Sequence, residues 1–251
     1  MHGRLQGKVA VITGGSAGIG LATAKVFAEE GATVFITGRR RNALDSAVTE
    51  IGHGAVGIEG DASNLDDLDT LYQRVKNDAG RVDVLFANAG GGSLLPLGEI
   101  TEDQVHDTFN SNVKGVIFTV QKALPLMGTG GSIILTGSTA GARGTPAFSV
   151  YSASKAAVRN FARSWALDLK GKGIRVNVLS PGPVHTPGLV GLAGDDHDQQ
   201  QGMLDEFAGL VPLGRIGRPD EIARAALFLA TEDSSFVNGA ELFADGGMAQ
   251  V

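Results

Sequence analysis

Seven short runs of apolar and β-branched residues recur along the 251-residue chain, separated by stretches long enough to hold helices. Runs of this kind, without polar alternation, are typical of strands buried on both faces of a parallel sheet. The runs are KVAVIT (8–13), TVFIT (33–37), AVGIE (55–59), VDVLFAN (82–88), SIILTGS (132–138), IRVNVLS (174–180) and ELFAD (241–245). We therefore predict seven buried strands.

Between these runs, apolar residues recur every three or four positions, which is the spacing of a helix with one buried face. The predicted helices cover residues 18–30, 65–79, 104–127, 149–170 and 220–230. Alternating strands and helices build right-handed βαβ units with parallel strands. The expected fold class is therefore α/β, a Rossmann-like, doubly wound, seven-stranded parallel sheet with helices on both faces.

No break in composition divides the chain, so we expect a single domain over residues 1–251. Residues 186–213 are richer in Gly, Asp and Gln and interrupt the alternation of strands and helices. We expect this stretch to be a mobile insertion over a substrate site, because long irregular loops in compact domains are usually functional.

The composition argues against several classes of protein. The chain has no cysteine, which removes disulfides and Cys-ligated zinc, and its five histidines lack metal-ligand spacing, so we expect no metal. A net charge of −6 argues against a nucleic-acid partner. No segment approaches the ~20 apolar residues of a membrane span, and the N-terminus lacks a secretory apolar stretch. We expect a soluble, cytoplasmic protein with no membrane partner.

The stretch TGGSAGIG (13–20) follows the first predicted strand, at the end of the sheet where doubly wound folds bind ligands. Its glycines have the spacing of neither the GxGxxG fingerprint nor the ATP-binding loop. Gly14 would permit a tight turn, while Gly18 and Gly20 would allow close approach to the backbone. The helix that begins near Gly18 would direct its amides at an anion, which fits a pyrophosphate. A tight turn without a ligand is the alternative.

Three motifs in this order, TGxxxGIG (13–20), NAG (88–90) and YxxxK (151–155), resemble those of the short-chain dehydrogenase/reductase family, and the similarity runs from residue 8 to residue 247. The resemblance implies a nicotinamide-dependent oxidoreductase that acts on a small-molecule substrate and forms a homotetramer. The cofactor-binding residues that it implies are Gly14, Ser16, Ala17, Gly18, Ile19, Gly20, Asp61, Ala62, Asn88, Ala89, Gly90, Tyr151, Lys155, Pro181, Gly182, Val184 and Thr186.

Tyr151 and Lys155 are four positions apart on a predicted helix and therefore share one face. A free tyrosine titrates near ~10, so a tyrosine that exchanges protons at neutral pH needs help from its surroundings. The Lys155 ammonium would supply it, which matches a general acid–base role for Tyr151 during hydride transfer. The alternative is a helix start with Tyr151 packed on the core and Lys155 in solvent.

Ser138 ends the fifth predicted strand and resembles the family's serine that orients the substrate carbonyl. It is a better candidate than Ser132 or Ser149, although a serine that only caps a turn is the alternative. Asn112, in NSNVKG, resembles the family's asparagine that holds a relay water near the lysine, and a merely tolerated polar residue is its alternative. The predicted catalytic residues are Asn112, Ser138, Tyr151 and Lys155.

Other parts of the resemblance also have structural alternatives. In the family, NAG (88–90 here) braces the sheet and lies beside the adenine ribose. Asp61 resembles the aspartate that meets the adenine amino group, but it could equally cap the next helix. Pro181–Gly182, with Val184 and Thr186, resembles the segment that receives the nicotinamide carboxamide, and an ordinary Pro-Gly turn is the alternative.

The residues after the second predicted strand favour NADP(H) over NAD(H). An NAD site usually carries Asp or Glu ~20 residues past the glycines, but this chain has Gly38 there and no acid between Gly31 and Leu44. Arg39 and Arg40 follow and would bind a 2′-phosphate, with Arg39 as the first choice. A solvated basic helix start is the alternative.

We therefore predict an NADP(H)-dependent carbonyl reductase or alcohol dehydrogenase that interconverts a ketone, with 3-oxoacyl compounds among the candidates, and a secondary alcohol. The alternatives are an NAD(H)-dependent alcohol, polyol or hydroxysteroid dehydrogenase and a non-catalytic, dinucleotide-binding regulatory protein. Apolar side chains that could line a pocket for a mostly apolar ketone are Leu94, Leu95, Leu189, Val190, Leu192, Met203, Leu204 and Phe207.

Overall fold

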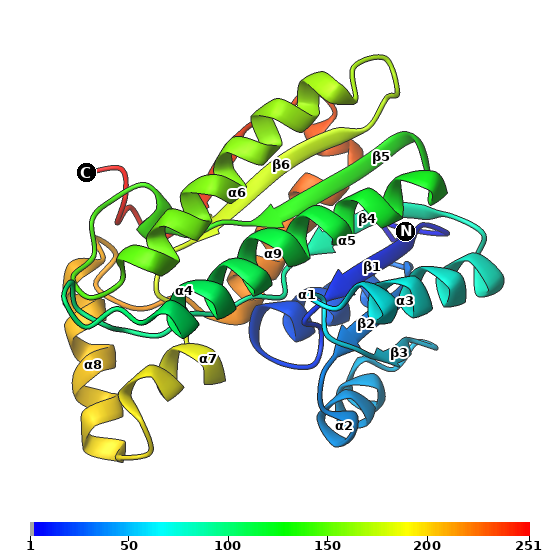
Figure 1. Cartoon of the computed structure of the whole chain (residues 1–251). Coiled ribbons are helices and arrows are strands. Elements are labelled where there is room, and N and C mark those ends of the chain that lie inside the picture. Colours follow the sequence, from blue (N-terminus) through cyan, green and yellow to red (C-terminus); the bar gives the residue numbers. More distant parts are fainter. Residues whose placement is uncertain (1–2) are drawn as a thin grey trace.

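The computed structural model describes residues 3–251, which contain a seven-stranded sheet (Figure 1). The strands are β1 (Val9–Thr13), β2 (Thr33–Gly38), β3 (Val56–Glu59), β4 (Val82–Ala87), β5 (Met127–Thr136), β6 (Arg175–Pro181) and β7 (Glu241–Ala244). Their order is β3-β2-β1-β4-β5-β6-β7, and each neighbouring pair is parallel. The order reverses between β1 and β4, so the ligand crevice of such a sheet lies at the carboxyl ends of these strands.

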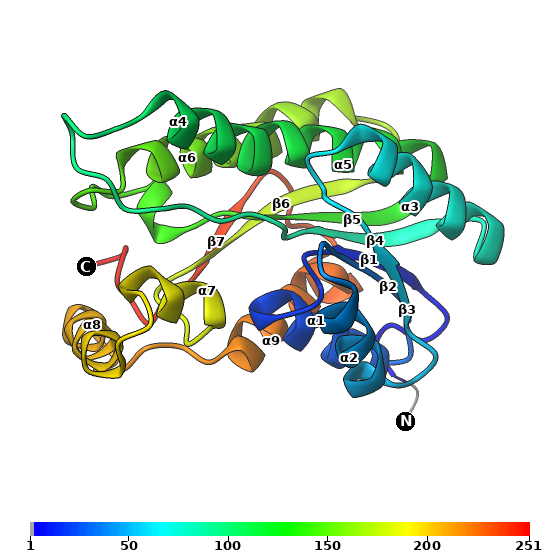
Figure 2. The same cartoon turned by 60° about the horizontal axis from the view of Figure 1, so that its bottom comes forward.

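Helices cover both faces of the sheet, which confirms the predicted fold class (Figure 2). On one face lie α3 (Leu65–Asp78), α4 (Glu102–Phe109), α5 (Gly115–Ala123) and α6 (Ser149–Asp168). On the other face lie α1 (Gly18–Glu29), α2 (Arg41–Ile51) and α9 (Pro219–Ala230).

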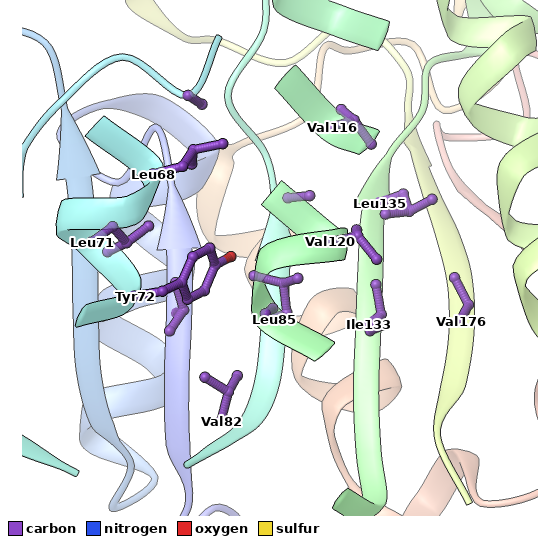
Figure 3. Close-up of a cluster of buried hydrophobic side chains, with 14 of the residues drawn as sticks. Leu68, Leu71, Tyr72, Val82, Leu85, Val116, Val120, Ile133, Leu135 and Val176 are labelled. Atoms are coloured by element: carbon purple, nitrogen blue, oxygen red, sulfur yellow. The ribbon is translucent and has the colours of Figure 1, made fainter. Parts of the chain in front are cut away.

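Two apolar cores, one on each face of the sheet, hold these layers together because burial of apolar surface drives folding. Successive strand side chains point to opposite faces, so Val11 joins one core and Ile12 joins the other. Figure 3 shows the first core, in which Leu85 and Ile133 of the sheet lie in one cluster with Tyr72 of α3. The sheet is therefore a rigid support for the residues at its carboxyl edge.

Most predicted elements lie within about two residues of their observed limits, but four regions differ, of which residues 186–213 are described below. The stretch predicted as one helix over 104–127 is divided into α4, a π-helical turn (Asn110–Lys114), α5 and a 3₁₀ turn. β5 begins at Met127 rather than near Ser132, because Met127 pairs with β4 across a bulge that the glycine-rich sequence concealed. Helix α2 was not predicted.

Residues 186–213, which we expected to be a mobile insertion, contain two helices. α7 (Pro187–Val190) and α8 (His197–Leu210) lie beyond the carboxyl ends of the strands (Figure 1). Each helix begins at a capping side chain, since Thr186 and Asp196 accept hydrogen bonds from backbone amides of the first turn. The segment therefore contains regular structure at the carboxyl edge of the sheet, and its place over a substrate site stays a prediction.

Candidate active site

The glycine-rich turn between β1 and α1 is shaped for close approach of a ligand to the backbone. Gly14 and Gly18 have φ values of 67° and 55°, which L side chains rarely adopt. A Cβ at Gly20 would lie 2.2 Å from the Gly14 carbonyl oxygen, so the turn has no room for one. The residue before α1 is Ala17, whose side chain cannot cap the helix, and the first amides of α1 therefore remain available to an anion.

Asn88, at the end of β4, braces the ends of the neighbouring strands. Its side-chain amide donates to the carbonyl oxygens of Thr13 and Gly14 at 3.1 and 3.3 Å. The Thr13 hydroxyl accepts from the amides of Asn88 and Ala89, each at 3.1 Å, and the Thr136 hydroxyl donates to the Asn88 side-chain oxygen at 3.3 Å. The bracing contacts of the NAG motif are thus present, and its contact with an adenine ribose stays a prediction.

Val184, after β6, presents a backbone donor and a backbone acceptor at the same edge. It forms an isolated parallel bridge with Gly217, made by the His185 amide to the Gly217 carbonyl and the Gly217 amide to the Pro183 carbonyl, each at 2.9 Å. In such a bridge the N–H and C=O of the central residue point away from its partner. Within residues 3–251, neither group of Val184 has a hydrogen-bond partner. This pair is complementary to a primary carboxamide.

The rest of this segment has structural contacts. Pro181 pairs with Ala244 of β7, and the Gly182 amide donates to the Ala244 carbonyl at 3.2 Å. The Thr186 side chain lies against the glycine turn, since a Cβ at Gly18 would come within 3.2 Å of its methyl carbon. The structure therefore brings Thr186 to the glycine turn, although the two are far apart in sequence.

The side chains of Ser138, Tyr151 and Lys155 meet where the end of β5 faces the start of α6. Lys155 Nζ lies 5.5 Å from the centroid of the Tyr151 ring and donates to the Thr136 carbonyl oxygen at 2.9 Å. The Ser138 hydroxyl accepts from the Ala140 amide at 3.2 Å, and it faces the Tyr151 side chain, whose pKa it lowers. Lys155 is only 4% exposed, so the alternative that placed it in solvent is wrong.

Burial dominates the electrostatics of this group. Desolvation raises the pKa of Tyr151 above its ordinary value, and the hydrogen bond with Ser138 opposes part of that rise. Desolvation also lowers the pKa of Lys155 to about 8, because a buried ammonium loses its hydration. At neutral pH, Tyr151 is thus a proton donor and Lys155 is mostly cationic.

Asn112 lies in the π-helical turn between α4 and α5 and is fully buried. Such turns frequently occur at functional sites. Its side-chain amide donates to the Gly91 carbonyl at 2.8 Å and to the Ser154 hydroxyl at 2.9 Å, and its oxygen accepts from the Gly91 amide at 3.0 Å. A Cβ at Gly90 would approach both Asn112 Oδ1 and Lys155 Nζ, so these two side chains flank one glycine. The relay water stays a prediction.

The three arginines after β2 have different partners. Arg39 is largely exposed and its Nη1 lies 4.0 Å from the Asp61 carboxylate, at the limit of an ion pair. Arg41 pairs with Glu59 at 3.1 Å. Arg40 is exposed and has no ion-pair partner in the described part of the chain. Arg39 and Arg40 are therefore the arginines with weak or no internal pairing.

Two further cofactor candidates have well-defined surroundings. Ser16 lies against Gly38, because a Cβ at Gly38 would come within 2.7 Å of Ser16 Oγ. The Asp61 carboxylate accepts from the amide and the hydroxyl of Ser63, each at 2.8 Å, whereas the cap of α3 is Asn64. The alternative that Asp61 caps the next helix is therefore wrong.

Some residues weighed from the sequence lie elsewhere. Ser132 is buried and donates to the Leu229 carbonyl, and Ser149 is exposed at the start of α6, so neither meets Tyr151 in the way Ser138 does. Ala62 packs into the first core. Phe161 and Trp165 stack with ring centroids 4.9 Å apart and pack on the same core. A homotetramer stays a prediction.

Three residues that hold or contact Tyr151 were not predicted from the sequence. The ring of Phe148 stacks on it, the backbone of Gly92 lies against it, and Gln104 holds the loop that contains Gly92. The signal that could have indicated this contact is the aromatic residue three positions before Tyr151 in the sequence. Among residues 3–251, no group of three His, Cys, Asp or Glu side chains could hold a metal, and no helix could cross a membrane.

Comparisons with known proteins agree with this arrangement. Residues 14–249 match the family model described as Enoyl-(Acyl carrier protein) reductase. Oxidoreductase asL5 of Sarocladium schorii is 52% identical, over 99% of this chain and 98% of its own. The NADP-dependent (R)-specific alcohol dehydrogenase of Lentilactobacillus kefiri is 38% identical, over 98% of each chain. A solved Short-chain dehydrogenase/reductase SDR:Glucose/ribitol dehydrogenase from Brucella melitensis superposes with a TM-score of 0.92, at 31% identity and full coverage of both chains.

The fold and the site thus define an oxidoreductase of the nicotinamide-using class. The chain belongs to the short-chain dehydrogenase/reductase family.

Proposed function

We propose that the protein is an NADP(H)-dependent carbonyl reductase and alcohol dehydrogenase, in which Tyr151 protonates the carbonyl oxygen of a ketone or takes the proton back from the alcohol. The observation that carries the proposal is the group of half-buried Ser138, half-buried Tyr151 and buried Lys155 at the carboxyl edge of the sheet. The bound nicotinamide would exchange a hydride with the carbonyl carbon.

The residues present fit a dinucleotide along this edge. The uncapped start of α1 and the glycine turn would receive the pyrophosphate, because backbone amides there carry the positive end of the helix dipole. The unpartnered donor and acceptor of Val184 would pair with the nicotinamide carboxamide. Asp61 and Asn88 would meet the adenosine. The glycine turn has no side chains between its backbone and the ligand, so the pyrophosphate could approach that backbone closely.

Each catalytic side chain would have one task. The Ser138 hydroxyl accepts from a backbone amide, so its own proton would be donated to the substrate carbonyl in place of its interaction with Tyr151. Lys155 is oriented by the Thr136 carbonyl, and its charge would stabilise the Tyr151 phenolate that forms as the proton leaves. Asn112 would anchor a water near Lys155, so that Lys155 can pass a proton to the Tyr151 phenolate and regain one from this water.

The substrate would be a mostly apolar ketone. Leu94 is 41% exposed on the loop after β4, which contacts the segment before Tyr151, and the sequences of α7 and α8 contain further apolar residues. The relative that is named as an NADP-dependent alcohol dehydrogenase supports a ketone and alcohol pair, and the description of the matching family model keeps acyl thioesters among the candidates.

The test is oxidation of NADPH, followed by absorbance, over a panel of apolar ketones, diketones, 3-oxoacyl esters and ketoses. We expect turnover with at least one ketone class and weaker turnover with polar ketoses. NADPH binding, measured by its fluorescence, is the control for a folded site. Binding without turnover across the panel would contradict the proposal and favour a regulatory dinucleotide-binding protein.

Arg39→Ala should weaken NADPH binding by about 10- to 100-fold and leave NADH binding nearly unchanged. The reason is that a hydrogen bond to a charged group contributes about 1.5–3 kcal/mol, and only NADPH carries the 2′-phosphate. Arg40→Ala should have a smaller effect. Dissociation constants for both cofactors would be measured by fluorescence titration.

Arg41→Ala is the matched control, because Arg41 already pairs with Glu59. Equal losses for NADPH and NADH in the Arg39 variant, or a wild-type preference for NADH, would remove the argument for NADP(H) without affecting the catalytic residues.

A further inference from the structure

The ring of Tyr151 is in contact with a second aromatic ring. Phe148 stacks on it with centroids 4.3 Å apart and an angle of 20° between the ring planes. Phe148 is the last residue before α6, so its ring lies at the helix start, beside the tyrosine and not inside a core. Stacked aromatic pairs are stabilised beyond the area that they bury. The pair therefore favours one orientation of the Tyr151 ring.

The backbone that carries Phe148 is held in an unusual conformation. Ala147 has φ 57°, and only His53 shares a positive φ with it among the non-glycine residues of 3–251. Such a conformation costs energy for a residue with a Cβ and persists where surrounding structure enforces it. The Ala147 carbonyl accepts from the Leu95 amide at 2.8 Å, which links this segment to the loop after β4.

The loop after β4 contacts Tyr151 from its own side. A Cβ at Gly92 would lie 2.6 Å from Tyr151 Cδ2 and 3.0 Å from Cβ and Cγ, so the Gly92 backbone packs directly on the tyrosine. Only glycine fits at this position without displacing the ring. Tyr151 is therefore confined by two segments, one from the loop after β4 and one from the start of α6.

The residues before and after Gly92 in the chain are each held by a buried side chain, one from the π-helical turn and one from α4. Asn112 forms the two hydrogen bonds with the Gly91 backbone described above. Gln104, on α4, donates from Nε2 to the carbonyl and to the hydroxyl of Ser93 at 3.0 and 3.1 Å. Gln104 is 8% exposed, so these bonds are shielded from water. The loop cannot move away from Tyr151 unless these contacts break.

We infer that the segments Gly91–Ser93 and Ala147–Phe148 form a clamp on Tyr151, and that Phe148 is a positioning residue that keeps the tyrosine hydroxyl directed at Ser138. The inference rests on the proposed function for its catalytic meaning. The clamp itself is a property of the protein without cofactor or substrate. Phe148 would act by excluding water from the ring face and by fixing the ring direction, while Tyr151 performs the proton transfer.

The clamp also affects the ionisation of Tyr151. Lys155, on the same helix, is the charged group that faces the ring, and Ser138 supplies a neutral hydroxyl. The loop after β4 supplies glycine backbone, and Phe148 supplies an apolar ring. Because an apolar neighbour disfavours the phenolate, removal of the Phe148 ring would let water in and lower the pKa of Tyr151.

The ionisation of Tyr151 can be followed by NMR without overlap from many tyrosines, since the chain contains only two. Tyr72 is buried in the first core, donates to the Thr119 carbonyl, and has a pKa raised far above its ordinary value by desolvation. Tyrosine labelled at Cζ would give two NMR resonances, assigned with Tyr72→Phe. We expect Phe148→Ala to shift the ring resonances of Tyr151 and to lower its titration midpoint by about one pH unit.

Phe148→Leu keeps most of the apolar cover and should give a smaller shift of the midpoint while still losing the ring-current effect on Tyr151. Phe236→Ala is the matched control, because Phe236 is fully exposed on the surface. In turnover assays, the Phe148 variants should lower kcat by about 10-fold with little change in KM, and should move the pH profile. Far-UV circular dichroism checks the fold of each variant.

Unchanged Tyr151 resonances and titration in both Phe148 variants would overturn the clamp. The NMR measurement needs no turnover, so it decides the clamp even if no ketone is reduced. Turnover with an unshifted Tyr151 would leave the proposed function standing and remove the role of Phe148.

Discussion

Replacement of Tyr151 by phenylalanine should lower kcat by about 10²–10⁴-fold, because a positioned general acid contributes on that order. The substitution removes one oxygen and keeps the ring that Phe148 and Gly92 confine, so the cavity and the fold should remain. NADPH affinity should change only a few-fold. The measurement is steady-state turnover of the best ketone from the panel, with cofactor affinity determined in parallel.

Tyr72→Phe is the control, since it makes the same chemical change at the other tyrosine of the chain. It removes a buried hydrogen bond to the Thr119 carbonyl and should cost about 1 kcal/mol of stability, with kcat unchanged. If Tyr151→Phe retained most of the turnover, the acid–base assignment would fail.

Lys155→Met should lower kcat by about 10²-fold or more and, at neutral pH, make the protein more stable. The catalytic loss follows because methionine carries no charge to stabilise the phenolate and no hydrogen-bond donor for the cofactor. The gain in stability follows because the lowering of the Lys155 pKa from 10.5 to about 8 corresponds to a penalty of about 3 kcal/mol on the buried ammonium. The lost bond to the Thr136 carbonyl offsets about 1 kcal/mol of this gain.

The same pKa difference fixes the pH dependence of the stability. Below pH 10.5 the unfolded lysine binds a proton, while the folded one binds it only below about pH 8. The Lys155 penalty is therefore complete below about pH 8 and fades as the pH rises to 10.5. The advantage of Lys155→Met in the free energy of unfolding should fade over the same interval, as measured by urea unfolding at several pH values.

Lys25→Met is the control for this prediction, because Lys25 forms an exposed ion pair with Glu50. Its loss should change the free energy of unfolding by less than about 1 kcal/mol at any of these pH values. A Lys155 variant that is less stable than the wild type at neutral pH would contradict the assignment of a strained, desolvated ammonium.

The sequence predicted the sheet well because buried parallel strands appear as apolar runs, and single polar residues such as Asp83 and Asn177 leave these runs recognisable. The four-residue spacing predicted that Tyr151 and Lys155 share one face of a helix, whereas the resemblance to the family was needed to add Ser138 to them. These signals are local, and the fold only has to bring two adjacent segments together.

The sequence did not predict α7 and α8, because α8 buries a single side chain and its apolar periodicity is weak. The capping residues Thr186 and Asp196 were the better signal there. The clamp on Tyr151 could not be predicted either. It depends on Gly92, whose contact with Tyr151 comes from a strand end about sixty positions away, and on the backbone conformation of Ala147.

The contact between Gly38 and Ser16 has a consequence for cofactor preference. A carboxylate at position 38 is what an enzyme of this fold would need to select the unphosphorylated ribose, yet any side chain there would press on Ser16 in the glycine turn. The two positions are therefore coupled, because a side chain at position 38 requires Ser16 to rotate or to be replaced by a smaller residue. A carboxylate at position 38 should accordingly be accommodated better together with Ser16→Gly than alone, so that cofactor preference depends on a pair of positions.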